Sequence, residues 1–450
     1  MKFSAKILFC ILYAISISFV FGQASVQAKE TKNTSNNYSF LLENPNKINE
    51  FLEQLNIKDE KVTIIREIGL IYIESNKNNV DLKKELTPYR KKIENYISVE
   101  GELPKLEVTL DKPNVNNVNE KIPDTKNPPL TSPMFKPFNF YLEDVTNNYQ
   151  SYFINKGEHT TIALIDSGID QTHPLLKNNI NFKKGKNYTS DKLDYDDEMG
   201  HGTSVAGVLV SIAPDTTIVP YKVLGEESGE SIWVLKAIVD ATNDGNDILN
   251  LSLGTYKMKS NKEEKLLIKA YEKATQYANK HGALVVSAAG NASKDLDKSK
   301  KSGEIYLPGS LKNVISVSSN TNQDTLSSYS NYGKAIDFSA PGGYLDENYD
   351  VTGLILTTFP VNKPNNIVDQ LIGVPAGYTL TYGTSLSAPQ VSAAAALIIS
   401  EYNKYNKKKP KINKIVKYLK KGSIDLGTTG YDTYFGYGKI NIYQSLINIK

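Results

Sequence analysis

The sequence predicts an α/β protein in two parts: a three-layer domain on a mainly parallel sheet, preceded by a small α+β domain of split βαβ order. From about Phe138 onward, short apolar strands alternate with helices, which is typical of βαβ units. Residues 38–110 instead follow the order β-α-β-β-α-β. Between them, 111–137 is rich in Asn, Pro, Lys and Thr and has the composition of a linker. We therefore expect a small domain over 29–110 and a large one over 138–450.

In the small domain, hydrophobic periodicity and β-branched runs define the elements. Ile48, Phe51 and Leu55 share one face of a helix, and Pro88 is expected to break or bend a second helix. The expected strands are Tyr38–Leu42, Val62–Arg66, Leu70–Glu74 and Leu106–Leu110, and the expected helices are Asn46–Leu55 and Val80–Ile97.

In the large domain, apolar runs of strand length alternate with segments of helical length. The expected strands are Thr160–Ile165, Thr217–Val223, Ile248–Ser252, Leu284–Ala288 and Val314–Val317, and the expected helices are Gly202–Ile212, Ser231–Asn243, Asn261–His281 and Ser385–Tyr402. This alternation is what predicts helices on the faces of a parallel sheet.

Residues 1–28 have the three-part pattern of a secretory signal peptide, with removal expected after Ala24 or Ala28. A basic start is followed by the apolar run Ile7–Phe21 and then by small residues. The alternative is an uncleaved membrane anchor, but the run is short for a span of about 20 residues. Cys10, the one cysteine, lies in this leader, so the mature chain is expected to lack disulfides, thiolate zinc sites and thiol catalysis.

Composition narrows the class of protein further. The chain has 52 Lys and Arg against 49 Asp and Glu, a balance that argues against a dedicated nucleic-acid binder. Ile447–Lys450 follows no wall-sorting motif, so we expect a secreted, extracellular protein. We also expect it to be monomeric and not to bind membranes once the leader is removed.

Three residues occupy positions that suit catalysis in an open α/β sheet, where chemistry collects at the carboxyl ends of strands. Asp166 follows the apolar strand directly, and His201 stands between two glycines that leave its ring accessible. Ser385 is expected at a helix start, because Pro389 fits the first turn. Taken singly, each has a plain structural alternative, such as an ordinary helix cap for Ser385.

Together the three form a set with chemical meaning. A serine becomes nucleophilic beside a base, and the base needs a carboxylate to fix its tautomer. The other histidines, His159, His173 and His281, have plain structural explanations; His281, for example, ends a helix, where a cation suits the dipole. We therefore interpret Asp166, His201 and Ser385 as catalytic.

The segments around these residues resemble the conserved blocks of the subtilisin-like serine proteases. They are 166–170 (DSGID), 201–207 (HGTSVAG), 383–389 (GTSLSAP) and 287–291 (SAAGN), and the Asp, His, Ser order is that of subtilisins. The resemblance covers about Tyr141 to Leu446 and implies a subtilisin-like fold and peptide hydrolysis through an acyl-enzyme.

The resemblance also implies roles for further residues. Asn291 would donate to the oxyanion. Two segments would pair with the substrate backbone on either side: Ser252, Leu253 and Gly254, and Glu227, Ser228 and Gly229. The first 110 residues resemble the family's propeptide, which assists folding and inhibits the enzyme until self-cleavage.

The chain departs from the family pattern at two places. Leu175 stands where members with the strong calcium site have an Asp, so that site is expected to be absent. A different, structural calcium could be held by the acidic segment with Asp194, Asp196 and Asp197, for which the alternative is a solvated loop. No cofactor is expected for the chemistry itself. The segment 342–378 is long for the family and is expected to form loops near the cleft.

Acidic residues near the expected cleft suggest a substrate. Asp295, Asp297 and Glu304 follow Asn291, and negative charge there would favour Arg or Lys before the cut bond. The alternative is that nearby lysines offset these charges.

Within the family, the chain most resembles the lantibiotic leader peptidases of the epidermin and nisin type. The shared features are a signal peptide, a propeptide, a catalytic domain without cysteine and acidic residues near the cleft. That resemblance implies a peptide or protein substrate, a lantibiotic precursor cut after a basic residue, with the chain's own propeptide as inhibitor. The alternatives are a broad extracellular protease acting on nutrient or host proteins and, less compatible with an intact Ser385 and His201, a protease-like binding protein.

Overall fold

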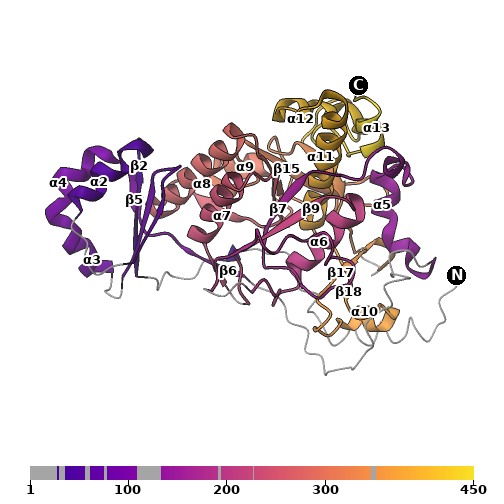
Figure 1. Ribbon diagram of the computed structural model, residues 1–450, viewed down its shortest axis with the longest axis horizontal. Coiled ribbons are helices and arrows are strands. Elements are labelled where there is room, and N and C mark those ends of the chain that lie inside the picture. Colours follow the sequence, from indigo (N-terminus) through magenta and orange to yellow (C-terminus); the bar gives the residue numbers. More distant parts are fainter. Residues whose placement is uncertain are drawn as a thin grey trace.

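The structure, a computed structural model, describes residues 28–29, 36–55, 61–75, 79–108, 133–190, 194–226, 228–345 and 351–449. The expected signal peptide except Ala28, most of the expected linker and Glu227 therefore lie outside the described residues. The described chain forms a large α/β domain and a smaller α+β domain at one end of the long axis (Figure 1).

A parallel sheet is the middle layer of the large domain. Counted within the described residues, its seven strands run in the order β16-β15-β13-β11-β7-β9-β8, and every neighbouring pair is parallel. The strands are β7 (Thr161–Asp166), β8 (Lys186–Asn187), β9 (Thr217–Lys222), β11 (Ile248–Leu251), β13 (Leu284–Ala288), β15 (Val314–Asn320) and β16 (Phe338–Pro341). Parallel strands end at one edge, so Asp166 lies at the carboxyl edge of the sheet.

Helices cover both faces because successive strand residues point to opposite sides. Ile162 and Leu164 pack in a core with α6 and α11, whereas Ala163 and Ile165 pack in a second core with α7 and α8. In Figure 1, α7 and α8 lie on one side of β7, and α6 and α11 lie on the other. These helices are α6 (His201–Ile212), α7 (Ser231–Asn243), α8 (Lys262–Lys280) and α11 (Thr384–Asn406). The predicted three-layer α/β architecture is confirmed. In the part of the chain that the structure describes, no helix has the length and apolarity to cross a membrane.

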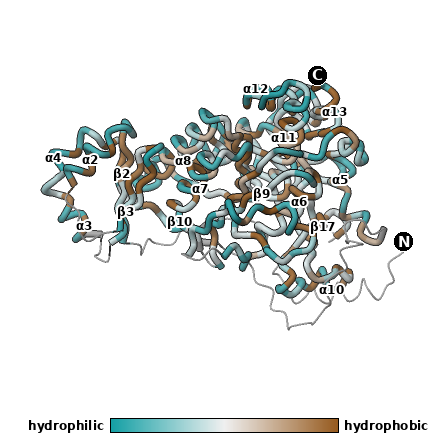
Figure 2. The backbone as a smooth tube through the Cα atoms, in the orientation of Figure 1, coloured by the Kyte–Doolittle hydropathy of each residue, from teal (hydrophilic) through white to brown (hydrophobic). Residues whose placement is uncertain are grey.

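The smaller domain is an antiparallel sheet of order β3-β4-β2-β5, covered on one face by short helices. Its elements are β2 (Asn37–Leu42), α2 (Ile48–Gln54), β3 (Lys61–Ile65), β4 (Leu70–Glu74), α3 (Asn79–Leu86), α4 (Arg90–Ile93) and β5 (Ile97–Gly101). Phe40 and Leu42, on one face of β2, pack with Ile48 and Phe51 of the helical layer. The tube at β2 is brown, the colour of hydrophobic residues (Figure 2). The split βαβ order of the prediction is confirmed.

One prediction for the smaller domain is confirmed in detail, and one strand differs. The helix expected over Val80–Ile97 breaks, as predicted, at Pro88, which has no N–H donor: α3 and α4 flank the 3-10 turn Thr87–Tyr89. The last strand of the sheet is β5, and not Leu106–Leu110. The latter prediction was wrong because the chain leaves the sheet after Gly101, and its next strand, β6 (Lys105–Val108), pairs with the large domain instead.

The smaller domain docks on the large domain through β6 and α8. β6 lies between β1 (Ala28–Lys29) and β10 (Ser228–Glu230), antiparallel to both. On α8, the Lys269 ammonium donates to the Ser98 hydroxyl over 3.1 Å, and the Lys273 ammonium donates to the Leu42 carbonyl over 2.5 Å. A strand from the small domain thus lies along an edge that belongs to the large one.

The long segment 342–378 folds against the helix that carries His201. It contains β17 (Ile355–Thr358) and α10 (Ile367–Ile372) and leads into β18 (Tyr378–Thr381), which pairs with β17. The Thr357 and Thr358 hydroxyls each donate over 2.6 Å to a carbonyl of α6. Phe135, from the end of the expected linker, is buried against this hairpin, so residues 133–139 are part of the folded structure.

Asp369 anchors α10 to β18 without a charged partner in the described structure. Its carboxylate accepts hydrogen bonds from the Leu380 amide, the Thr379 hydroxyl and the Asn366 side chain. The residue is fully buried, and that burial raises the pKa of Asp369 to about 7, although these hydrogen bonds lower it. The folded protein therefore binds a proton here that the unfolded chain releases near pH 3.8.

We expect the Asp369 site to lower the free energy of unfolding as the pH rises from about 4 to about 7. In this window the folded state holds more protons than the unfolded state, and the full shift corresponds to at most about 4 kcal/mol. Asp369→Asn should remove this fall relative to its parent. Urea unfolding at several pH values, in an inactive Ser385→Ala background, measures it. The exposed Asp215→Asn is the control, and parallel curves for all three proteins would contradict the prediction.

Candidate active site

Asp166 and His201 meet at the carboxyl edge of the sheet. Asp166 ends β7, and His201 begins α6 after Gly200, whose φ of 84° is a left-handed conformation that favours glycine. The His201 Nδ1 lies 2.7 Å from the Asp166 Oδ1. The carboxylate thus fixes the ring with its proton on Nδ1 and leaves Nε2 as the basic nitrogen. Among the described residues, nothing hydrogen-bonds to Nε2.

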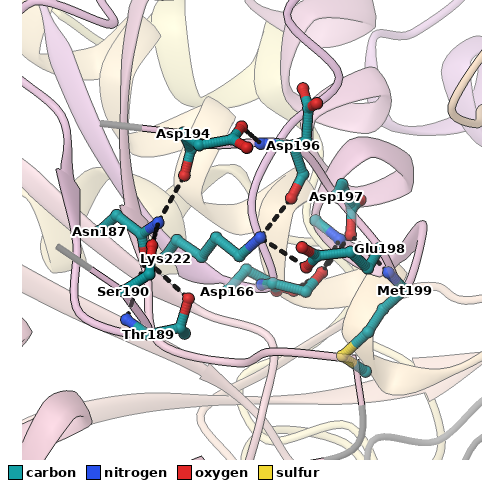
Figure 3. A network of polar contacts seen from close by, with 12 residues as sticks. Asp166, Asn187, Thr189, Ser190, Asp194, Asp196, Asp197, Glu198, Met199 and Lys222 are labelled. Atoms are coloured by element: carbon teal, nitrogen blue, oxygen red, sulfur yellow. Dashed lines mark hydrogen bonds and ion pairs between the residues drawn. The ribbon is translucent and has the colours of Figure 1, made fainter. Parts of the chain in front are cut away.

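A second buried carboxylate, Asp197, lies close to Asp166 (Figure 3), and the Ser167 hydroxyl donates to both. The Asp197 Oδ1 accepts from the Ser167 hydroxyl over 2.7 Å and from the Gly200 amide over 2.8 Å, and its Oδ2 accepts from the Thr203 amide over 2.7 Å. Burial alone lowers the pKa of His201, but Asp166 and then Asp197 outweigh it and hold that pKa above its usual value. Asp197 therefore both caps the start of α6 and favours the imidazolium.

The described acidic residues of this segment have hydrogen-bond and ion-pair partners within the protein, and the calcium site expected there stays a prediction. Asp197 is occupied as described, and the Asp194 carboxylate accepts the Asp196 amide over 2.9 Å. Buried Lys222, at the end of β9, donates to the Asp196 carbonyl and, over 2.6 Å, to Glu198 (Figure 3). Within the described residues, no group of three or more His, Cys, Asp or Glu could hold a metal ion. The Lys222 ammonium is the cation that this segment surrounds.

Ser385 and Asn291 are held together at the start of α11. Ser385 is the second residue of that helix, as its sequence position predicts, and its carbonyl accepts from the Ser252 hydroxyl over 2.8 Å. The Asn291 Oδ1 accepts from the Thr384 amide over 2.9 Å and from its hydroxyl over 2.7 Å. Because Oδ1 is taken up in this way, the Asn291 NH₂ group points away from Thr384. The contacts described for Ser385 include no hydrogen bond to Nε2, and such contacts often tighten only when substrate binds.

The expected substrate strands lie at the same edge. Ser252, Leu253 and Gly254 follow β11, and Gly229 lies in β10, where β6 pairs with it in the way an added peptide strand would. Glu227 lies outside the described residues. The backbone of β10 is thus already paired with the chain's own strand β6.

The three acids expected around the specificity pocket all have partners. Asp295 caps α9 (Leu296–Lys301) by accepting the Asp297 and Lys298 amides, and Asp297 accepts the Lys334 amide over 3.1 Å. Glu304 accepts the Lys294 ammonium through both oxygens at 2.8 Å. The alternative of lysine-compensated charge therefore describes Glu304 and also Asp295, whose Oδ2 lies 3.4 Å from the Lys298 ammonium, whereas Asp297 acts as a backbone acceptor.

Tyr306 is a residue that sequence reasoning missed. Its buried ring lies against Gly254, Gly290 and Gly309: a Cβ atom at Gly254 or Gly290 would collide with the ring, and one at Gly309 would be in tight contact with it. Gly254 belongs to an expected substrate segment and Gly290 directly precedes Asn291, so this ring lies beside both parts of the expected site. The three glycines were visible in the sequence, but nothing there indicated which side chain they accommodate.

Comparison with known proteins agrees with this geometry. The model of the subtilase family, Peptidase S8, matches residues 157–438. The chain is a subtilase. It is therefore a serine protease, as the resemblance implied.

This subtilase is similar to the epidermin leader peptide-processing serine protease of Staphylococcus epidermidis, with 31% identity over 355 residues, 68% of this chain and 73% of that one. Among solved structures, a lanthipeptide protease is 45% identical with a TM-score of 0.69, covering 71% of this chain and 96% of that one. The epidermin leader peptide processing protease of Staphylococcus aureus is 27% identical with a TM-score of 0.71, covering 93% and 100%. The latter likeness extends over both domains.

Proposed function

We propose that this subtilase removes the leader peptide from a secreted lantibiotic precursor. Its similarity to a lanthipeptide protease and to epidermin leader proteases supports this substrate class, and the fit of β6 to the β10 edge supports an extended peptide. That strand pairing supports the proposal most directly, because β6 occupies a backbone edge to which an extended peptide would add in the same way.

In the proposed reaction Ser385 attacks the peptide carbonyl while the His201 Nε2 takes its proton. Asp166 orients the ring through its 2.7 Å contact, and the Asn291 NH₂ group donates to the oxyanion of the acyl-transfer intermediate. His201 then returns the proton to the leaving amine, and water hydrolyses the acyl-enzyme. Since the raised pKa of His201 delays its deprotonation, activity should rise with pH above the usual histidine range.

The proposal extends to the precursor form. Residues 1–28 would direct secretion, residues 29–110 would act as the intramolecular inhibitor, and 111–137 would contain or adjoin the maturation cut. Support comes from β6, which lies on β10 where substrate would bind, and from the contacts of Lys269 and Lys273 with the smaller domain.

We further propose cleavage after a basic residue. Glu304 is the pocket acid for this role, and an incoming Arg or Lys would have to replace Lys294 at its carboxylate. The exchange replaces one charge-assisted ion pair of Glu304 by another of the same kind.

A cleavage panel tests the function. The mature enzyme should leave casein and unrelated folded proteins intact while it cuts synthetic leader–core junction peptides with Arg or Lys before the bond. The same peptides with Ala or Glu there, and the Ser385→Ala enzyme, are the controls. Broad digestion of casein would support the alternative of a general extracellular protease, and equal cutting of all junctions would contradict the basic preference alone.

A further inference from the structure

Glu230 is a large-domain carboxylate whose polar partners come from the smaller domain. In the described contacts, the Tyr72 hydroxyl donates to its Oε2 over 3.3 Å, and the Lys105 ammonium lies 4.0 Å from its Oε1. Only 22% of the Glu230 side chain is exposed. When the smaller domain leaves, this carboxylate loses both partners and becomes part of an open strand edge.

The strand register shows what an incoming peptide would place there. Gly229 pairs with Leu106, and Glu230 pairs with Lys105. Directly opposed residues of antiparallel strands project to the same face with neighbouring Cβ atoms, so the residue in the Lys105 register meets Glu230. The peptide residue after it projects to the other face.

The neighbouring position is apolar and buried. Leu106 is only 4% exposed and belongs to a core that joins the two domains and contains Leu224 and Ile232 of the large one. A peptide docked on β10 would therefore bury the apolar side chain in the Leu106 register on one face. On the other face, the preceding side chain, in the Lys105 register, would meet the Glu230 carboxylate. These two positions define the register of a peptide on β10, whichever of its bonds is cut.

Charge decides which side chain suits the Glu230 position. A half-buried carboxylate that loses water needs a donor or a cation, whereas a second carboxylate opposite it would be repelled. Burial raises the pKa of Glu230 and Lys105 lowers it, as expected for a carboxylate that depends on its cationic neighbour.

We propose that Glu230 forms a substrate subsite for a lysine or arginine side chain that immediately precedes a buried apolar residue on the β10 edge. The proposal rests on the proposed peptidase function and deepens it. In the precursor, Lys105 fills this subsite, so the smaller domain imitates the substrate at a position separate from the pocket near Glu304.

The first test compares mature wild type with Glu230→Gln on a library of extended peptides randomised at each position before the cut. Wild type should prefer Lys or Arg over Glu about tenfold in kcat/KM at one position followed by an apolar residue. Glu230→Gln should reduce this preference to about twofold or less with kcat unchanged, and Glu230→Lys should favour Glu. The exposed Glu226→Gln is the matched control and should keep the wild-type profile.

The second test needs no activity and uses the full chain with Ser385→Ala. Hydrogen exchange at the amides of Lys105–Val108 should accelerate in Lys105→Glu and recover in the Lys105→Glu/Glu230→Lys pair. No preference at any such position, a preference that survives Glu230→Gln, or no recovery in the pair would each overturn the subsite. Broad casein digestion would instead contradict leader processing and leave these results standing, so the two failures are distinguishable.

Discussion

Ser385→Ala is expected to lower kcat/KM by about 10⁶-fold and to leave the N-terminal domain attached. The hydroxyl is the proposed nucleophile, and its loss leaves His201 without a group to deprotonate. Folding should be preserved, because the described hydrogen bond of Ser385 to Ser252 uses the Ser385 carbonyl. Intact-mass analysis of secreted wild type and variant measures the effect, since only wild type should lose its first 100 or so residues.

Ser387→Ala is the matched control for this experiment. Ser387 lies in the same helix, and its hydroxyl donates to the Ala340 carbonyl over 2.9 Å, so its loss changes packing but not the proposed chemistry. The control should mature like wild type. If Ser385→Ala is shortened in the same way as wild type, another protease performs the maturation. If neither wild type nor Ser385→Ala is shortened, the self-processing proposal is wrong. The new N-terminus of wild type reports the residue preferred before the cut.

The large-domain fold was predictable because its signals are local. Thr161–Asp166 is apolar on both faces, as a strand between two helical layers must be, and the small residues of 201–212 allow a helix to pack closely on the sheet. The glycines around His201 and the proline after Ser385 likewise act on neighbouring residues. The positions of the proposed catalytic residues followed from such features.

The end of the smaller domain was not predictable in this way. Ile97–Gly101 and Lys105–Val108 both have strand-like composition, but one pairs with β2 and the other with β10. The choice depends on a partner more than 100 residues away, and local propensity carries no information on it.

The acidic residues show the same limit. Asp197 and Glu304 both stand in charged segments of the sequence, yet one caps α6 and the other pairs with Lys294. A carboxylate becomes a cap, an ion-pair partner or a ligand according to the donors that the fold brings to it. Glu230 illustrates this most clearly, because its partners Tyr72 and Lys105 belong to the other domain.

Asn291→Ala is expected to lower kcat about 100- to 1000-fold with little change in KM, the usual loss for one oxyanion donor. The Thr384 amide and hydroxyl both donate to the Asn291 Oδ1, which holds the amide plane and directs the NH₂ group away from Thr384. A preoriented donor favours the transition state because the negative charge appears only there. Steady-state kinetics on a junction peptide separates kcat from KM.

Thr384→Val distinguishes the donor from its support. It removes the hydroxyl but keeps the backbone amide on Oδ1, so Asn291 remains partly fixed and the loss in kcat should be clearly smaller than that of Asn291→Ala. Added to Ser385→Ala, Asn291→Ala should cause little further loss, because residues that act on one intermediate are not additive. A rise in KM with unchanged kcat would instead show that Asn291 binds the substrate ground state, and the oxyanion would then need donors other than this side chain.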